Sequence, residues 1–166
     1  AKLASATLLL IERKHIHTDA EFRMIQEQHR EKVKVSFRDA HAQICDIMLA
    51  TYVFFENQPP EIQQQWRNFV DKIDRLLEDA LKKTTKASLQ DLSRTLNGDS
   101  KQEPLPLFRV RAILDSWKMD FSPTLNQLKE LLQTVCRDTT MMLMEVPRLW
   151  DHLNAEKAKR DTKKKA

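Results

Sequence analysis

Glycine is almost absent from this chain. Its 166 residues include one glycine, Gly98, whereas a P-loop or a dinucleotide-binding loop needs several glycines whose backbone amides wrap a phosphate. The same shortage disfavours β-sandwiches and barrels, which need many turn residues. Hydrophobic residues make up 41% of the chain and charged residues 31%, a composition typical of long helices with few interruptions. The sequence therefore predicts a mainly α protein that does not hydrolyse ATP.

Cysteines and long hydrophobic runs are also scarce. The two cysteines, Cys45 and Cys136, lie within apolar helical segments. We interpret them as buried free thiols of a reducing compartment, with a disulfide as the open alternative. The longest apolar runs, Ala6–Ile11 and Met141–Met144, fall far short of the roughly 20 residues that cross a membrane. We therefore expect no membrane partner.

Excess positive charge is confined to one end of the chain. The net charge is +4, and residues 155–166 alone carry six lysine and arginine side chains against two carboxylates, so the rest of the chain is neutral. A nucleic-acid-binding protein usually spreads its basic residues over a face of the folded body. We therefore interpret this end as a solvated helix end or connection, and we expect no nucleic-acid partner. The alternative is a stand-alone helical adaptor that binds an acidic protein or a nucleic acid through this tail.

Groups that could catalyse a reaction or bind a metal form no motif in the sequence. His15 and His17 are two residues apart, which places them on different sides of a helix. The other histidines are isolated in the sequence: His29, His41 and His152. Carboxylates such as Asp71 and Asp74 lie beside lysines and arginines, and we interpret them as part of a solvated helix face. We expect no catalytic residue, no metal ligand and no cofactor.

The spacing of apolar residues predicts two long helices. Apolar positions recur every three or four residues over Val33–Glu56, and again over Ile62–Leu96, where continuity across the polar stretch Lys82–Lys86 stays open. Pro59 and Pro60 separate the two runs, because proline lacks an amide donor and restrains the residue before it. A connection this short places the two helices antiparallel and side by side.

The ends of these helices carry weaker signals. Asn97 and Gly98 predict a left-handed cap at the end of the second helix. The first 30 residues have helix-like spacings only in part, at Leu8 and Ile11 for example, and Asp19 is a candidate cap for a new helical turn.

A change of period after the loop Asp99–Pro106 predicts a β-hairpin between helices. Apolar and polar residues alternate over Leu107–Ile113 and again over Trp117–Phe121, on either side of a short polar turn. A lone hairpin is marginally stable in water, so we expect its apolar face to lie on a helix. The fold class that follows is an elongated helical bundle with one short β-hairpin inserted between helices.

A further helix is predicted directly after the hairpin. Ser122 is a candidate N-cap and Pro123 then occupies the first helical position. Pro147 is expected to kink or divide this helix, and a last segment from Leu149 to about Lys159 fades into charge. We divide the chain into N-terminal helices (1–58), a helix–hairpin–helix segment (59–154) and a basic end (155–166).

Methionines and tryptophans are the candidate contact residues. The run Met141–Met144 is either core filling or an adaptable partner surface, because thioethers repack easily. Trp66, Trp117 and Trp150 are interpreted as core or helix-interface anchors. We single out Trp150, Met141 and Met144 as the side chains that face a partner.

Three motifs occur in the order found in one protein family. They span Ser88–Asp99, Pro106–Phe108 and Phe121–Leu125. The first resembles the pattern Ser-Leu-x-x-Leu-Ser-x-x-Ile/Leu-Asn-Gly-Asp of axonemal dynein heavy chains, and Val146–Leu149 is also similar to that family. The resemblance covers about Pro60 to Leu149. The motif residues to which we assign a structural role are Ser88, Leu89, Leu92, Asn97, Gly98, Asp99, Phe108, Phe121, Ser122, Pro123 and Leu125.

The resemblance implies a place in the tail, or stem, of such a heavy chain, upstream of the linker and the motor ring. It implies a non-catalytic segment that transmits force and supports assembly of the complex that drives ciliary and flagellar beating. The implied partners are other heavy, intermediate and light chains and components of the axonemal doublet microtubule. The implied location is the cytoskeleton of a ciliary or flagellar axoneme. Outer-arm or inner-arm identity stays open.

Overall fold

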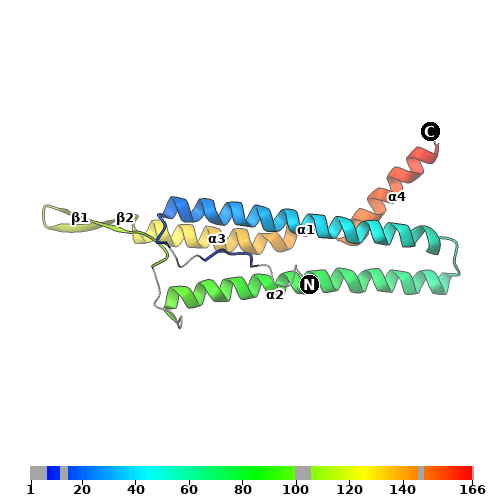
Figure 1. The fold of residues 1–166 in the computed structure, drawn as a ribbon, viewed down its shortest axis with the longest axis horizontal. Coiled ribbons are helices and arrows are strands. Elements are labelled where there is room, and N and C mark those ends of the chain that lie inside the picture. The colour runs from blue at the N-terminus through cyan, green and yellow to red at the C-terminus, as the bar shows by residue number, and fades with distance from the viewer. Residues whose placement is uncertain (1–6, 12–14, 100–105, 146–147, 166) are drawn as a thin grey trace.

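Long helices lying along one axis dominate the molecule. The computed structural model describes residues 7–11, 15–99, 106–145 and 148–165. Its elements are α1 (Asp19–Phe55), α2 (Pro60–Asn97), β1 (Arg111–Asp115), β2 (Lys118–Ser122), α3 (Leu125–Glu145) and α4 (Leu149–Lys165). In Figure 1, α1 and α2 run antiparallel, α3 lies alongside α1, and the hairpin extends past one end of the bundle. The prediction of a mainly α, elongated fold with a β-hairpin between helices is confirmed.

Helix α1 begins at a capping box one residue before the predicted cap. The Thr18 hydroxyl accepts a hydrogen bond from the Glu21 amide at 3.2 Å, and the Glu21 carboxylate accepts one from the Thr18 amide at 2.9 Å. This reciprocal pair satisfies two amides that have no partner within the helix. The assignment of the cap to Asp19 was therefore wrong by one residue. The helix also starts well before Val33, while residues 7–11 lie outside any helix despite the spacing of their leucines.

Helix α2 runs without a break from Pro60 to Asn97, so the continuity over Lys82–Lys86 is resolved. At about 1.5 Å per residue it is roughly 57 Å long. Thr84 and Thr85 are buried within the polar stretch, and their hydroxyls donate to the carbonyls four residues earlier at 2.9 Å. Because these hydrogen bonds satisfy the buried hydroxyls, the polar stretch does not interrupt the helix.

The predicted glycine cap of α2 is confirmed. Gly98 has φ 74° and ψ 12°, and its amide donates to Thr95 O at 3.3 Å while the Asp99 amide donates to Arg94 O at 3.1 Å. A left-handed residue after the last turn satisfies carbonyls that the helix leaves without partners. Glycine adopts this backbone conformation without the steric cost of a Cβ atom.

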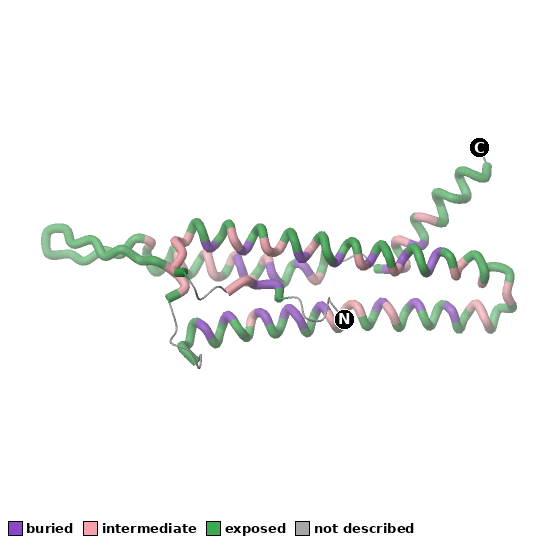
Figure 2. The backbone as a smooth tube through the Cα atoms, viewed as in Figure 1, coloured by how far each residue is buried: buried purple, intermediate pink, exposed green. Residues whose placement is uncertain are grey.

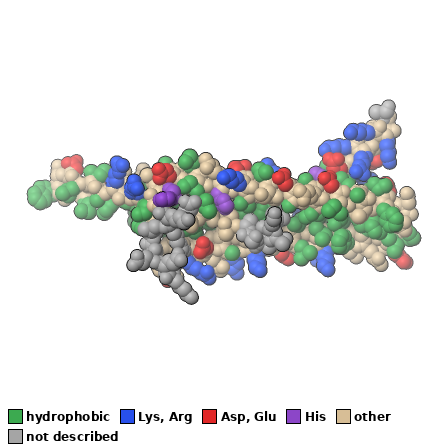
Figure 3. All heavy atoms as spheres, in the orientation of Figure 1, with side chains coloured by type: hydrophobic (Ala, Val, Ile, Leu, Met, Phe, Trp, Pro, Cys, Tyr) green, Lys and Arg blue, Asp and Glu red, His purple; other side chains and the backbone are tan. Residues whose placement is uncertain are grey.

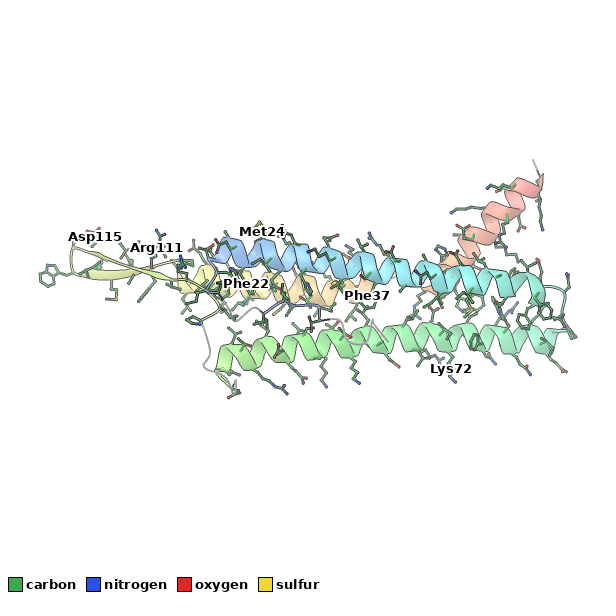
Figure 4. All side chains as sticks on the ribbon, in the orientation of Figure 1. Phe22, Met24, Phe37, Lys72, Arg111 and Asp115 are labelled. Carbon is green, nitrogen blue, oxygen red and sulfur yellow. The ribbon has the colours of Figure 1, made fainter. Side chains whose placement is uncertain are left out.

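The core is a series of apolar clusters between the facing sides of the helices. Figure 2 shows buried residues along the inner sides of α1 and α2, with exposed residues on their outer sides. Figure 4 shows Phe22 and Phe37 pointing from α1 toward the other helices, whereas Met24 and Lys72 point outward. Three clusters follow one another along the bundle, and α4 contributes to the one nearest the α1–α2 turn. Each helix therefore buries one stripe, as an amphipathic surface helix does.

The hairpin differs from its prediction in position and in packing. The register pairs Asp115 with Lys118, so Ser116 and Trp117 form a two-residue turn with φ of 46° and 74°. The strands therefore begin at Arg111 and Lys118, which is four residues later than predicted for the first strand and one residue later for the second. Every strand residue is exposed. The expectation that the apolar face lies on a helix was wrong, and so was the assignment of Trp117 to a core, because its side chain is 100% exposed.

The start of α3 also lies two residues later than predicted. Ser122 is the last residue of β2, and the Ser122–Pro123 peptide bond is cis. The cap is Thr124, whose hydroxyl accepts from the Gln127 amide at 3.3 Å while its own amide donates to Gln127 Oε1 at 2.9 Å. Ser122 as N-cap and Pro123 at the first helical position were therefore wrong. Pro147, where a kink or division was expected, lies outside the described residues.

Among the described helices, none has a stretch that is both apolar enough and long enough to span a lipid bilayer.

Candidate functional site

Motif residue Ser88 holds the N-terminal segment against α2. Its hydroxyl donates to Thr84 O at 2.9 Å and accepts a hydrogen bond from the Leu8 amide at 3.0 Å. On the α1 side, the Gln26 side chain donates to Leu10 O at 2.6 Å and accepts from the Leu10 amide at 3.0 Å. Residues 7–11, which we call the N-terminal strap, are thus fixed to both long helices. Gln26, only 1% exposed, was missed because a polar residue in a helix is normally solvated.

Motif residues Leu89, Leu92 and Phe108 belong to the core at the hairpin end. Leu92 is buried in a cluster with Leu9, Phe22 and Val135, against which Leu89 and Phe108 pack. The Phe108 ring meets Phe22 edge-on with centroids 5.0 Å apart, and the next amide, that of Arg109, donates to His17 O at 2.7 Å. Phe108 therefore ties the segment before the hairpin to the start of α1.

Other motif residues lie on the surface at this end. Phe121 is 52% exposed on β2 and Leu125 is 81% exposed at the start of α3, while Leu114 near the tip is 75% exposed. Leu125 also lines an apolar groove of about 560 Å³, together with residues that include Leu96, Phe108, Leu128, Leu132 and Cys136. We call the hairpin together with this groove the hairpin end.

The opposite end of the bundle also has exposed apolar side chains, which gather there in Figure 3. A groove of about 550 Å³ lies between α1, α2 and α4, lined by residues that include Tyr52, Trp66 and Trp150. Both long helices also carry exposed apolar residues near the turn that joins them: Ile47, Val53, Phe54 and Phe69. Ile47 and Phe69 line a second groove of about 310 Å³. We call this region the turn end.

The structure divides the three residues singled out as partner-facing. Trp150 is half-buried, stacks edge-on with Trp66 at 5.7 Å, and lines the groove at the turn end. Met144 is 86% exposed and Met141 is 48% exposed, whereas Met142 between them is buried. The methionine run therefore supplies both a core residue and two surface residues.

Acidic residues of α2 hold the start of α4. Asp74 Oδ1 accepts a hydrogen bond from the Leu149 amide at 2.8 Å, and Asp71 Oδ1 accepts one from the Trp150 indole at 2.5 Å. Glu78 pairs with Arg148 at 3.2 Å and with Lys82 at 2.6 Å. The hydrogen bond and positive charge of Lys82, and to a smaller extent those of Arg148, lower the pKa of Glu78. The interpretation as a solvated face was wrong for Asp74, which is buried. A carboxylate at a helix N-terminus satisfies a free amide and interacts favourably with the helix dipole.

The side chains of two histidines and one cysteine meet between α1 and α4. One potential ligand atom from each of His41, Cys45 and His152 lies within 4.8 Å of the other two. Cys45 Sγ is 3.6 Å from His41 Nδ1, and the two imidazole rings are 5.8 Å apart and nearly perpendicular. His41 and His152, which are isolated in the sequence, are therefore neighbours in the fold. The spacing of His41 and Cys45, four residues apart on one helix face, was the signal that the sequence offered.

Burial governs the chemistry of the thiols. Burial, with a smaller contribution from the carboxylates of Asp46 and Asp74, raises the pKa of Cys45 to about 11. Burial also raises the pKa of Cys136. Both cysteines are free, but only Cys45 is buried, whereas Cys136 is partly exposed. The prediction of buried free thiols is therefore confirmed for Cys45 and was wrong about the burial of Cys136.

Comparison with known proteins finds similar sequences among axonemal dynein heavy chains. The chain is 38% identical, over 160 residues and 96% of its length, to the dynein-1-beta heavy chain of the flagellar inner arm I1 complex of Chlamydomonas reinhardtii. It is 36% identical, over 140 residues and 81% of its length, to dynein axonemal heavy chain 2 of Homo sapiens and of Mus musculus. The chain is homologous to axonemal dynein heavy chains. No protein-family model matches it.

The dynein homology extends beyond the motifs that first suggested it. A match over 96% of the chain takes in most of the first 50 residues, which the motif resemblance left unplaced. The chain spans only 3% to 4% of the length of these heavy chains. It is therefore related to one small segment of a much larger protein.

Proposed function

We propose that this chain is a non-catalytic structural segment of a dynein heavy-chain tail that supports assembly of an axonemal motor complex and transmits force along it. The observation that carries the proposal is the pair of exposed apolar ends on one continuous bundle, in a chain homologous to axonemal heavy chains. A motor that steps must pass load through elements that do not stretch. Two helices of about 55 Å, packed along their length, are suited to that task.

Location and partners follow from the same proposal. The names of the relatives place those proteins in a flagellar inner arm complex and in the axoneme. We propose the same cytoskeletal setting for this chain, with other heavy, intermediate and light chains and doublet-microtubule components as partners. The hairpin end and the turn end are the proposed contact surfaces, because contiguous exposed apolar patches mark interaction sites. Trp150 lines the groove at the turn end. Met141 and Met144 are further exposed apolar side chains near the end of α3 and are proposed as an additional contact.

The hairpin end supplies the decisive experiment. In a heavy chain that contains this segment, Leu114→Ser combined with Trp117→Ser removes apolar surface without touching the core. We expect this variant to be lost from axonemes, as measured by quantitative blotting of isolated axonemes. The ATPase rate of the purified motor region should stay unchanged, since the proposed role is in assembly.

A matched control uses an exposed apolar residue away from both ends. Val35 is 51% exposed on the mid-region of α1, so Val35→Ser removes a smaller area of exposed apolar surface outside the hairpin end and the turn end. Normal axonemal content of the double variant would contradict the proposed contact, and so would equal loss of the control. A fall in the ATPase rate of the isolated motor would contradict the structural role.

One observation favours the alternative adaptor function. The end of α4 extends away from the bundle in Figure 1, and its last turn carries Lys163, Lys164 and Lys165. If this basic end binds an acidic protein or a nucleic acid, binding should weaken steeply with salt, because each phosphate contact releases counterions. Filter binding at two salt concentrations, with and without residues 155–166, tests the alternative. Binding that is independent of these residues, or absent, would exclude it.

A further inference from the structure

We propose that His41, Cys45 and His152 form a zinc-binding site that fastens α4 to α1. Nothing in the dynein homology or in the proposed assembly function requires such a site. It rests on the meeting of two imidazoles and one thiol from two helices at the edge of the core cluster near the turn end. Imidazole and thiolate are the ligand types that zinc takes in proteins, whereas magnesium and calcium take oxygen ligands.

The distances suit a zinc ion. Zn–N bonds of about 2.0–2.1 Å and a Zn–S bond of about 2.3 Å place tetrahedral ligands roughly 3.3–3.6 Å apart. His41 Nδ1 and Cys45 Sγ are already 3.6 Å apart. One potential ligand atom from each of His41, Cys45 and His152 lies within 4.8 Å of the other two. Small side-chain movements would bring the three ligand atoms to these separations. Three protein ligands leave the fourth position to a water molecule.

Charge and burial around the cluster also favour a cation. The Cys45 side chain is 0% exposed, and the next residue, Asp46, is acidic. A thiolate without a counterion is costly in that setting, and a divalent cation removes the cost. On binding, Zn²⁺ takes two neutral imidazoles and the Cys45 sulfur as ligands, and the thiol proton is released to solvent. His152 is partly exposed and provides the route by which the ion enters.

The site would link elements that are far apart in the chain. His41 and Cys45 lie on α1 and His152 on α4, on the same side of α4 as Leu149 and Leu153, which pack in the core cluster. A metal bond here adds to the carboxylate contacts that hold the start of α4 on α2. Because an ordered site is absent from the unfolded chain, metal binding stabilises the fold.

The test is metal titration of the 166-residue chain after removal of metal with a chelator. We expect one equivalent of Zn²⁺ to bind, the unfolding temperature to rise, and Co²⁺ as a probe to give the absorption of a thiolate–cobalt bond. Cys45→Ala and His152→Gln should each weaken Zn²⁺ binding by at least about 100-fold and remove the cobalt–thiolate band or shift it. His152→Gln serves as the second variant, since His152 is outside the apolar core and its change leaves the fold intact.

Matched controls remove the same groups elsewhere. Cys136→Ala deletes the other thiol, and His29→Gln deletes a histidine on the same helix α1. Both controls should bind one Zn²⁺ as the unchanged chain does. The proposal is overturned if the unchanged chain binds no Zn²⁺ with the fold intact by circular dichroism, or if binding survives both Cys45→Ala and His152→Gln. It is also overturned if Cys136→Ala abolishes binding.

Discussion

Buried polar side chains at single positions decide how the segments of this molecule meet. Gln26, Asp74 and Ser88 are each less than 9% exposed. Each bonds the backbone of a segment distant in sequence: the strap for Gln26 and Ser88, the start of α4 for Asp74. A buried polar group with a partner contributes modestly to stability, but it is costly when the partner is removed. These positions should therefore be more sensitive to substitution than their polarity suggests.

Asp74 provides the direct check at this scale. Asp74→Ala leaves the Leu149 amide without its acceptor in a buried setting, and we expect a loss of about 1–3 kcal/mol in the free energy of unfolding. Asp74→Asn keeps an oxygen acceptor and should lose less. Urea unfolding followed by circular dichroism measures both. An alanine variant as stable as the unchanged chain would show that this bond does not hold α4.

Burial of the Cys45 thiol makes the free energy of unfolding depend on pH in the alkaline range. The thiol's ordinary pKa of 9.0 applies to the unfolded chain, whereas burial raises the pKa to about 11 in the fold. Below pH 9 both states hold the proton and the stability is fully present. Between pH 9 and 11 the unfolded state releases its proton first, so the free energy of unfolding falls as pH rises, by about 1–2 kcal/mol.

The measurement compares urea unfolding of the chain and of Cys45→Ala across that pH window with chelator present. Lysines titrate in both proteins, so the difference between the two curves isolates the thiol. Parallel curves from pH 8 to 11 would mean that Cys45 is not held protonated by the fold.

At the scale of elements, the ends of helices and strands carry the informative chemistry. Gly98 is the clearest example, because an added Cβ would meet nothing within 4 Å. The cost of Gly98→Ala therefore comes from the backbone alone, at φ 74°, and we expect a loss of about 1 kcal/mol. Gly98→Asn should lose less, because asparagine tolerates the left-handed region. Thermal unfolding of the three proteins tests this order, and an alanine variant no less stable than the asparagine variant would contradict it.

Element ends also show how far the sequence could predict the fold. The spacing of apolar residues every three or four positions correctly predicted the long antiparallel helices, and Gly98 correctly predicted one cap, because both signals are local. The caps at Thr18 and Thr124 were each missed because a neighbouring residue, Asp19 or Ser122, offers a similar oxygen. The packing of α4 on α2 could not be predicted from the sequence, since Asp74 and Leu149 are 75 residues apart. The His41–Cys45–His152 cluster was missed for the same reason.

At the scale of the whole molecule, the hairpin contributes little to the folding stability of the bundle. The strand residues of the hairpin are all exposed, while the core clusters lie between the helices and the strap. Hydrophobic stabilisation follows the apolar area removed from water. The hairpin's apolar residues thus contribute to association with other surfaces and little to the folding of the bundle.

This separation predicts opposite outcomes for two sets of serine substitutions. Leu114→Ser with Trp117→Ser, which changes side chains 75% and 100% exposed, should leave the unfolding midpoint of the 166-residue chain unchanged and improve its solubility. Leu92→Ser, at a side chain only 3% exposed in the same dynein-like region, should cost about 3 kcal/mol or more, through the lost apolar burial and the buried hydroxyl. Urea unfolding and sedimentation of the three proteins measure both effects. A hairpin variant that unfolds as readily as Leu92→Ser would show that the hairpin packs on the bundle, and its apolar face would then belong to the core rather than to a contact surface.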